Sequence, residues 1–162
     1  DRKLRKRQLM VLRLVRGLTG GRTIELGYGV TVTHRAFSYA DLREAESTAL
    51  RLARETLPAT RAFDAASIDD EDLPPEHEEA LRGQAARHLV KLLLLRFGTG
   101  WGGLETDRGE PAPLEADSLD LFLDLFPGVA SALHGQLLSP WHELEREGNG
   151  YAPSPSTATA EG

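Results

Sequence analysis

The most constraining feature of this chain is a run of apolar residues from position 89 to 95, broken only by Lys91. Three glutamates, at positions 76, 78 and 79, suit the first turn of a helix, where the helix dipole favours negative charge. A helix is therefore predicted from about residue 76 to Phe97. So many leucines leave little room for a polar face. We therefore expect this helix to be the most buried element.

A second helix is predicted from about residue 38 to Leu57. Ser38 resembles an N-cap, and Asp41 stands three positions later as the acid of a capping box. Pro58 ends the helix. Its apolar face is rich in small residues that allow close packing, and we take it as a candidate partner-binding face. This face consists of Leu42, Ala45, Ala49, Leu52 and Ala53.

Further helices are predicted in the C-terminal half. The apolar residues between 119 and 126 indicate a third core helix, and Pro127 can begin another because its missing N–H costs nothing there. The pair Ser139-Pro140 repeats that start signal and predicts a short last helix that Gly148 ends. Three aspartates at 117, 120 and 124 share one helix face, which we interpret as a solvated face opposite Leu121 and Leu125.

Extended structure is expected near the N-terminus. Residues 23–35 alternate apolar and polar side chains around the flexible turn Gly27-Tyr28-Gly29, which predicts a β-hairpin. A lone hairpin is only marginally stable, so it should pack on a helix. Residues 98–114 hold five glycines and two prolines and are predicted to be a structured loop around Trp101. Trp101 and Trp141 both flank Gly or Pro elements, and we expect them to be structural anchors.

Three flanking or linking segments differ in composition from the rest. Residues 1–20 contain a predicted basic amphipathic helix (2–18), with Leu4, Val11, Leu12, Leu14, Val15 and Leu18 on one side. Residues 64–75 read as an acidic linker, and residues 150–162 as a disordered tail. The fold class is therefore mostly α. We expect a single domain over 21–149 with four to six helices and an N-terminal β-hairpin.

Charge and composition exclude several classes of protein. Residues 1–16 carry seven basic side chains against Asp1, a net +6, whereas the rest of the chain carries twelve basic and twenty-four acidic residues, a net −12. The acidic body should repel nucleic acid. Without cysteine there are no disulfides, thiolate metal sites or cysteine nucleophiles. No apolar run approaches 18 residues, and Arg13 and Arg16 interrupt the only stretch that mimics a secretory signal. We expect a cytoplasmic protein.

Catalytic motifs are not evident. His142-Glu143 could open a zinc-protease motif, but Arg146 stands where the second histidine is needed. The five histidines form no i, i+4 ligand pair. Gly27-Tyr28-Gly29 is too short for a phosphate-binding loop, and no serine sits in a nucleophile elbow. The sequence thus predicts a non-enzyme with no cofactor and no metal.

The order of motifs in the C-terminal half resembles a known family. Trp101-Gly102-Gly103-Leu104 is followed by Asp107, Gly109, Pro111 and Pro113, a helical block through Phe126-Pro127, then Pro140, Leu144, Glu145, Glu147-Gly148-Asn149-Gly150 and a Pro/Ser tail. A looser match covers residues 30–50, where the strand Val30 to Val32 precedes Ser38-Tyr39-Ala40 and an Ala-rich helix. This order resembles tail assembly chaperones of long-tailed (siphovirus-like) bacteriophages and prophages.

The resemblance implies a non-virion assembly factor in the cytoplasm of the bacterial host. Such a chaperone binds the helical tape measure protein, keeps it soluble and helps recruit tail tube subunits. The tape measure protein is thus the expected partner, with the tail tube protein and a second copy of the chain as further candidates. Two alternatives stay open: a head–tail connector or other small virion protein, and a nucleic-acid-binding regulator that uses the basic N-terminal helix.

Overall fold

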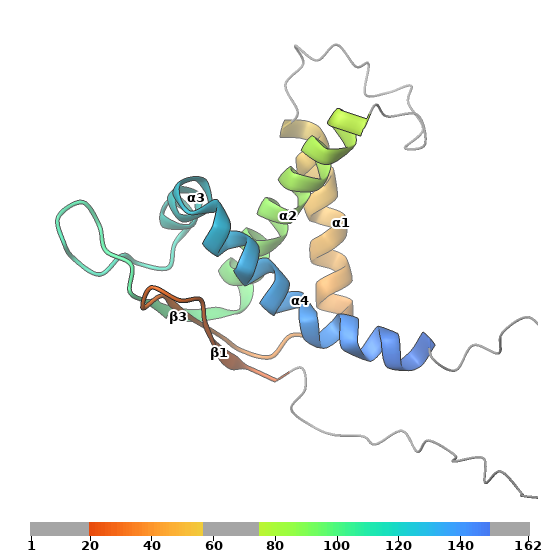
Figure 1. Cartoon of the computed structure of the whole chain (residues 1–162), viewed down its shortest axis with the longest axis horizontal. Helices are drawn as coiled ribbons and strands as arrows, with labels where there is room; N and C mark the ends of the chain where they lie inside the picture. Colours follow the sequence, from red (N-terminus) through yellow and green to blue (C-terminus); the bar gives the residue numbers. More distant parts are fainter. Residues whose placement is uncertain (1–19, 57–74, 150–162) are drawn as a thin grey trace, which may run out of the picture.

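A long helix, α2 (Pro75–Phe97), forms the centre of the protein. The computed structural model describes residues 20–56 and 75–149 (Figure 1). Leu89, Val90, Leu93 and Leu94 are each at most 5% exposed, as their apolar run predicts. Leu95 is 47% exposed, so the helix is not buried all round as expected. The predicted basic helix over 2–18, the acidic linker before residue 75 and the tail 150–162 lie outside the described residues.

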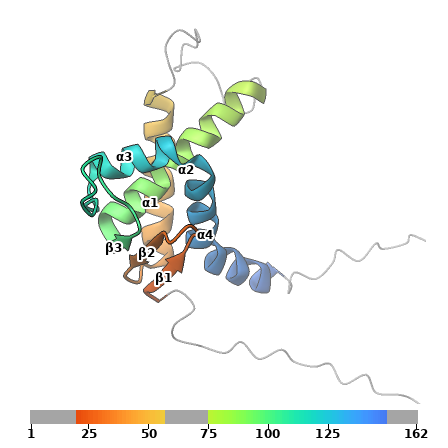
Figure 2. The ribbon, with the colours of Figure 1, turned by 60° about the vertical axis from the view of Figure 1, so that its left-hand side comes forward.

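The helix α1 (Tyr39–Thr56) packs antiparallel against α2, and the two lie side by side in both views (Figures 1 and 2). Arg96 near the end of α2 pairs with Asp41 at the start of α1 at 3.3 Å. The capping box is confirmed: the Ser38 N–H donates to Asp41 Oδ2 at 2.8 Å, and the Asp41 N–H donates to Ser38 Oγ at 3.1 Å. The hydrogen bonds from the Ser38 backbone and hydroxyl lower the pKa of the Asp41 carboxyl.

The small-residue face of α1 is used inside the protein. Leu42, Ala49 and Ala53 are at most 3% exposed, and Ala45 packs against the same core. Leu52 is half-buried. This face was a candidate for partner binding, and that interpretation needs correction. The alanines let α1 approach α2 closely, so α2 occupies the surface that a partner would need.

A three-stranded antiparallel sheet covers one end of the helices. The predicted hairpin is present as β1 (Arg22–Glu25) and β2 (Thr31–His34), joined by the turn at Gly27-Tyr28-Gly29. The third strand, β3 (Gly98–Gly102), follows α2 directly and pairs with β2, giving the order β1-β2-β3. Ile24, Val32 and Trp101 stand opposite one another in the register, and Ile24 and Val32 face the core.

The strand β3 replaces the first part of the loop expected over 98–114. Its sequence is rich in glycine, which is depleted in strands, so local propensity gave no signal. The glycines are needed for close approach: a Cβ on Gly98 would lie 2.4 Å from the Leu94 carbonyl oxygen. At Gly103, whose φ is +76°, a Cβ would lie 2.2 Å from the Gly29 carbonyl oxygen. The strand therefore fits only because these side chains are absent.

The C-terminal half forms two helices, α3 (Ala116–Leu125) and α4 (Pro127–Asn149). As predicted, Pro127 begins α4. However, Pro140 lies inside this helix instead of starting a separate one. A proline cannot donate to the carbonyl four residues earlier, here that of Gln136. The Arg22 guanidinium donates to this carbonyl instead. A residue from the sheet thus compensates the hydrogen bond that the proline removes.

The two helices meet at a sharp corner. Within residues 20–56 and 75–149, no single helix has the length and apolar character needed to cross a bilayer, and α3 with α4 would pass only as a pair bent by 112°. Leu119, Phe122, Leu133 and Leu137 from this pair are buried against α2 and the sheet. The corner itself carries Phe126, which remains 47% exposed.

Candidate apolar groove

The helix α3 presents three different faces. Leu119, Phe122 and Leu123 are buried in the core. At about 100° per residue, Asp120 and Asp124 form a second face turned toward α2. The third face carries Leu121 and Leu125, whose exposed fractions are 61% and 66%. We expected these two leucines in the core, and the structure corrects that interpretation. They form the most exposed pair of neighbouring leucines among the described residues.

Ion pairs with α2 set the rotation of α3. Arg87 lies 3.1 Å from Asp120 and 3.0 Å from Asp124, and Lys91 Nζ lies 2.8 Å from Asp120. The hydrogen bond from Lys91 is the main cause that lowers the pKa of Asp120. The sequence pattern indicated a solvated face for these aspartates. In the structure, Asp120 and Asp124 instead form ion pairs with α2. Because these contacts turn the aspartates toward α2, the leucines at 121 and 125 must face away from it.

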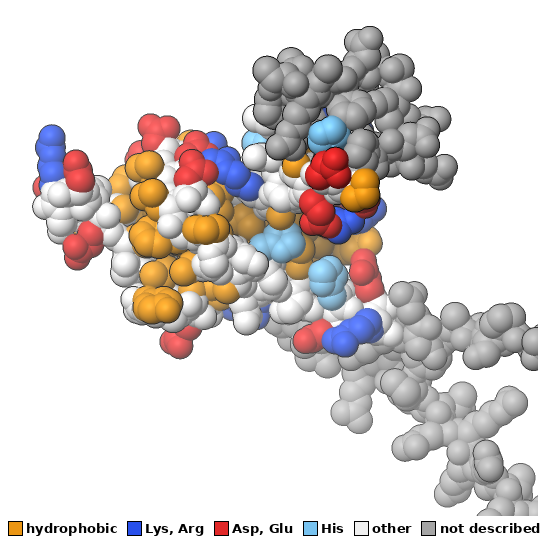
Figure 3. Space-filling model, turned by 45° about the horizontal axis from the view of Figure 1, so that its top comes forward, with side chains coloured by type: hydrophobic (Ala, Val, Ile, Leu, Met, Phe, Trp, Pro, Cys, Tyr) orange, Lys and Arg blue, Asp and Glu red, His pale blue; other side chains and the backbone are white. Residues whose placement is uncertain are grey.

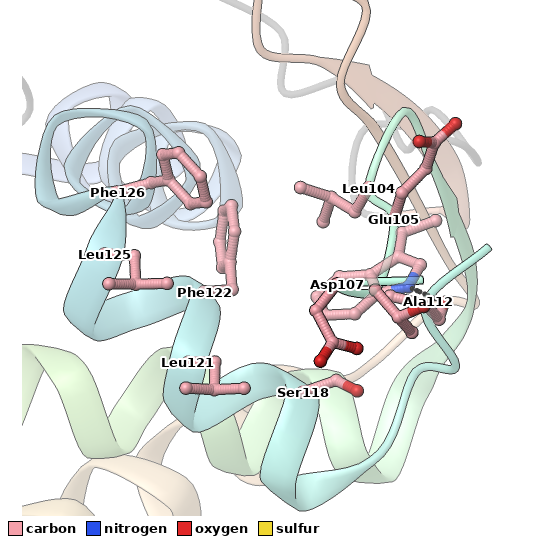
Figure 4. Close-up of a pocket in the computed structure, with 11 residues that line it drawn as sticks. Leu104, Glu105, Asp107, Ala112, Ser118, Leu121, Phe122, Leu125 and Phe126 are labelled. Atoms are coloured by element: carbon pink, nitrogen blue, oxygen red, sulfur yellow. Dashed lines mark hydrogen bonds between the residues drawn. The ribbon is translucent and has the colours of Figure 1, made fainter. Parts of the chain in front are cut away.

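An open groove lies beside these leucines. It has a volume of about 630 Å³ and runs between α3 and the segment 103–113, which we call the 103–113 loop. In Figure 4, Leu121, Leu125 and Phe126 stand on one side, and Leu104 and Asp107 face them across the gap. Trp101, Phe122 and Ala112 form part of the lining. Figure 3 shows hydrophobic side chains gathered on this part of the surface, with acidic side chains at its edges. A surface of this kind is typical of a binding groove.

The 103–113 loop is held by its own hydrogen bonds. The Thr106 N–H donates to the Glu110 carbonyl at 2.7 Å, and the Ala112 N–H donates to the Leu104 carbonyl at 2.9 Å. Gly109, with φ of +75°, closes a turn by donating its N–H to the Thr106 carbonyl at 3.0 Å. The loop is therefore a small hairpin-like projection, and the groove wall that it forms is defined before any ligand binds.

Trp101 ties this loop to the sheet. Its indole N–H donates to the Ala112 carbonyl at 2.7 Å, and its ring makes an edge contact with Phe122 at 5.7 Å between centroids. Its ring also lines the groove. Trp141 is 9% exposed and packs against Phe37 and Tyr39 at 6.0 and 5.7 Å. The contacts of both tryptophans are those expected of structural anchors. The loss of stability on removing either ring stays a prediction.

The surroundings of the groove are acidic. Between residues 98 and 126 there are seven acidic side chains and one basic side chain, Arg108, giving a net charge of −6. Asp120 and Asp124 are neutralised by α2. The five other acids are exposed: Glu105, Asp107, Glu110, Glu115 and Asp117. An apolar floor with an acidic rim favours a ligand that is apolar on one side and basic at its margins.

The groove offers no evident catalytic chemistry. In the described parts of the chain, no three His, Asp or Glu side chains are grouped so that they could hold a metal ion. Comparison with models of protein families, with curated proteins and with solved structures gave no match. The geometry and the charge of the groove are therefore the evidence for its role.

The sequence contained the signal for this groove, but its meaning was ambiguous. The spacing of the aspartates at 117, 120 and 124, with apolar residues between them, shows that α3 is amphipathic. It does not show which of its faces meets the core, because α3 has more apolar residues than one core face requires. Only the position of Arg87 and Lys91 in three dimensions decides this.

Proposed function

We propose that this protein is an assembly chaperone that binds an amphipathic helix of another protein in the groove between α3 and the 103–113 loop. The observation that carries the proposal is the exposure of Leu121 and Leu125 beside a groove of about 630 Å³. Helix-in-groove recognition uses apolar side chains at i, i+3, i+4 and i+7 of the bound helix. The groove supplies the apolar surface for such a stripe, and its acidic rim suits basic side chains beside it.

The more specific proposal is a tail assembly chaperone that binds the tape measure protein of a long-tailed phage. The support for it is the resemblance in motif order from Trp101 to Asn149, in which Trp101 and Leu104 line the groove. A long helical protein with exposed apolar stripes needs such a cover before assembly, because exposed apolar patches cause aggregation. The groove would shield one stripe segment at a time.

Co-expression with the tape measure protein of the same phage or prophage tests the proposal. We expect the chaperone to retain the tape measure protein in the soluble fraction and to co-purify with it. The variant Leu125→Gln should lose most of this capture, whereas Leu95→Gln, at an exposed leucine on α2, should keep it. Equal capture by both variants would exclude the groove as the binding surface. The absence of the protein from purified virions would separate a chaperone from a head–tail connector.

A further inference from the structure

We propose that the groove is occupied, in the free protein, by the basic amphipathic segment 2–18 of the same chain. The segment has one apolar side, with Leu4, Leu12 and Leu18 among its members, and a net charge of +6 over residues 1–16. This inference does not depend on the tape measure protein, because it concerns the isolated chain. It assigns the groove an internal ligand that any partner helix must displace.

The basic segment and the rim of the groove carry opposite charges. Asp120 and Asp124 are already paired with α2, and the five other acids of residues 98–126 face only Arg108, which leaves a net charge of −4 around the groove. Two of them, Glu105 and Asp107, line the groove itself. Opposite charges at a short distance attract strongly where solvent is partly excluded. The most basic segment of the chain thus matches an apolar groove with an acidic rim.

Segment 2–18 joins the fold within reach of the groove. Segment 2–18 joins the fold just before β1, and Arg22 at the start of β1 contacts the Gln136 carbonyl of α4. Phe126, at the corner of the groove, lies ten positions before Gln136, which corresponds to about 15 Å along a helix. A helix over 2–18 would be about 25 Å long at the same rise. The segment is therefore long enough to extend from residue 20 to the groove.

The surface of α4 between these two points can accept a helix. Gly128, Ala132 and Gly135 fall on one side of α4 and are all exposed. A Cβ placed on Gly128 or Gly135 would meet no atom within 4 Å. Small residues let two helix backbones approach closely, which adds van der Waals contact. The apolar side of the segment would then pack along α4 with its far end beside Leu121 and Leu125.

A spin-label experiment on the full chain tests this arrangement. The protein has no cysteine, so the variant Leu9→Cys can carry a nitroxide at one defined position, on the side of the predicted helix away from Leu4 and Leu18. We expect the methyl resonances of Leu121 and Leu125 to lose most of their intensity in the paramagnetic state. The methyls of Leu50, an exposed leucine on α1, should keep theirs. Adding Leu125→Gln to the labelled protein should restore the Leu121 signal, whereas adding Leu95→Gln should not.

A mixing experiment identifies the source of the effect. Isotope-labelled protein without the nitroxide is mixed with unenriched, spin-labelled protein. Groove broadening in the mixture would assign the occupant to a second copy and overturn the proposal. Undisturbed groove methyls in the single labelled protein would also overturn it, and would place the basic segment elsewhere, such as against the acidic residues 64–75. Neither result depends on tape measure binding, so failure here is distinct from failure of the chaperone proposal.

Discussion

Truncation of Leu125 to alanine should weaken binding of the tape measure protein without changing the stability of the free chaperone. Full burial of a leucine side chain contributes about 1.5–3 kcal/mol. Leu125 is 66% exposed when segment 2–18 does not cover the groove, so in a chain that lacks residues 1–18 a helix that covers it would gain about two-thirds of this amount, or about 1–2 kcal/mol. Since 1.4 kcal/mol corresponds to a tenfold change in Kd, the variant should bind roughly 5- to 30-fold more weakly.

The assay is a titration of a fluorescently labelled tape measure segment with the wild-type protein and with two variants, all without residues 1–18 so that the basic segment cannot compete for the groove. Leu125→Ala removes a groove side chain, and Leu95→Ala removes a leucine that is 47% exposed on α2. Both are surface changes, so the free energy of unfolding of each variant should stay within about 0.5 kcal/mol of the wild type. This match allows a difference in Kd to be assigned to the groove.

Two results would refute the reasoning. One is an equal Kd for Leu125→Ala and Leu95→Ala, which would show that the groove does not contact the ligand. The other is a fall of several kcal/mol in the unfolding free energy of Leu125→Ala. That fall would show that Leu125 belongs to the core and that α3 is rotated differently from the arrangement described here.

Four further outcomes are expected. Trp101→Ala should lower the free energy of unfolding by about 3 kcal/mol, the low end for a large aromatic, and an unchanged Tm with lost partner binding would contradict its anchoring role. Asp120→Asn should lower the free energy of unfolding by about 1 kcal/mol. Because the fold lowers the pKa of Asp120, this contribution is present above the ordinary pKa of 3.8 and is lost as the pH falls below 3.8. Acid unfolding of the wild type and the variant measures the difference. Burial lowers the pKa of His134 below its ordinary 6.5, so the fold should lose stability as the pH falls through and below that value, and His134→Gln should flatten the Tm between pH 7.5 and 5.5. Finally, the intact protein should not shift duplex DNA at physiological salt, since its body opposes phosphate; a salt-sensitive shift that disappears on removal of residues 1–18 would favour a regulator.

The elements that the sequence predicted well are those with local signals. The capping box at Ser38 and Asp41, the turn at Gly27-Tyr28-Gly29 and the buried leucines of α2 all depend on residues close in the chain. Each pattern fixes one local geometry regardless of what surrounds it. The helical fold class and the hairpin could therefore be predicted correctly.

The elements that it predicted poorly depend on partners far apart in the chain. The strand β3 has a glycine-rich sequence without strand propensity and forms because β2 offers its edge. Pro140 can begin a helix or interrupt one, and here Arg22, from a distant part of the sequence, makes the second outcome acceptable. The face of α3 that meets the core is chosen by Arg87 and Lys91 on α2. Periodicity alone cannot supply such information.

The same long-range contacts explain why the groove exists before a ligand binds. One face of α3 is fixed by the core and a second by the ion pairs with α2, while the 103–113 loop is fixed by its own hydrogen bonds and by the Trp101 indole. Neither wall needs to be ordered when a helix enters. Association then requires little loss of conformational entropy in the chaperone, which raises affinity without added contact area. An apolar surface that is held open in this way must be covered in the free protein or expose the chain to self-association. The proposed cover by the basic segment 2–18 meets that requirement by attraction to the acidic rim, and a partner with a longer apolar stripe would bury more apolar area and replace it.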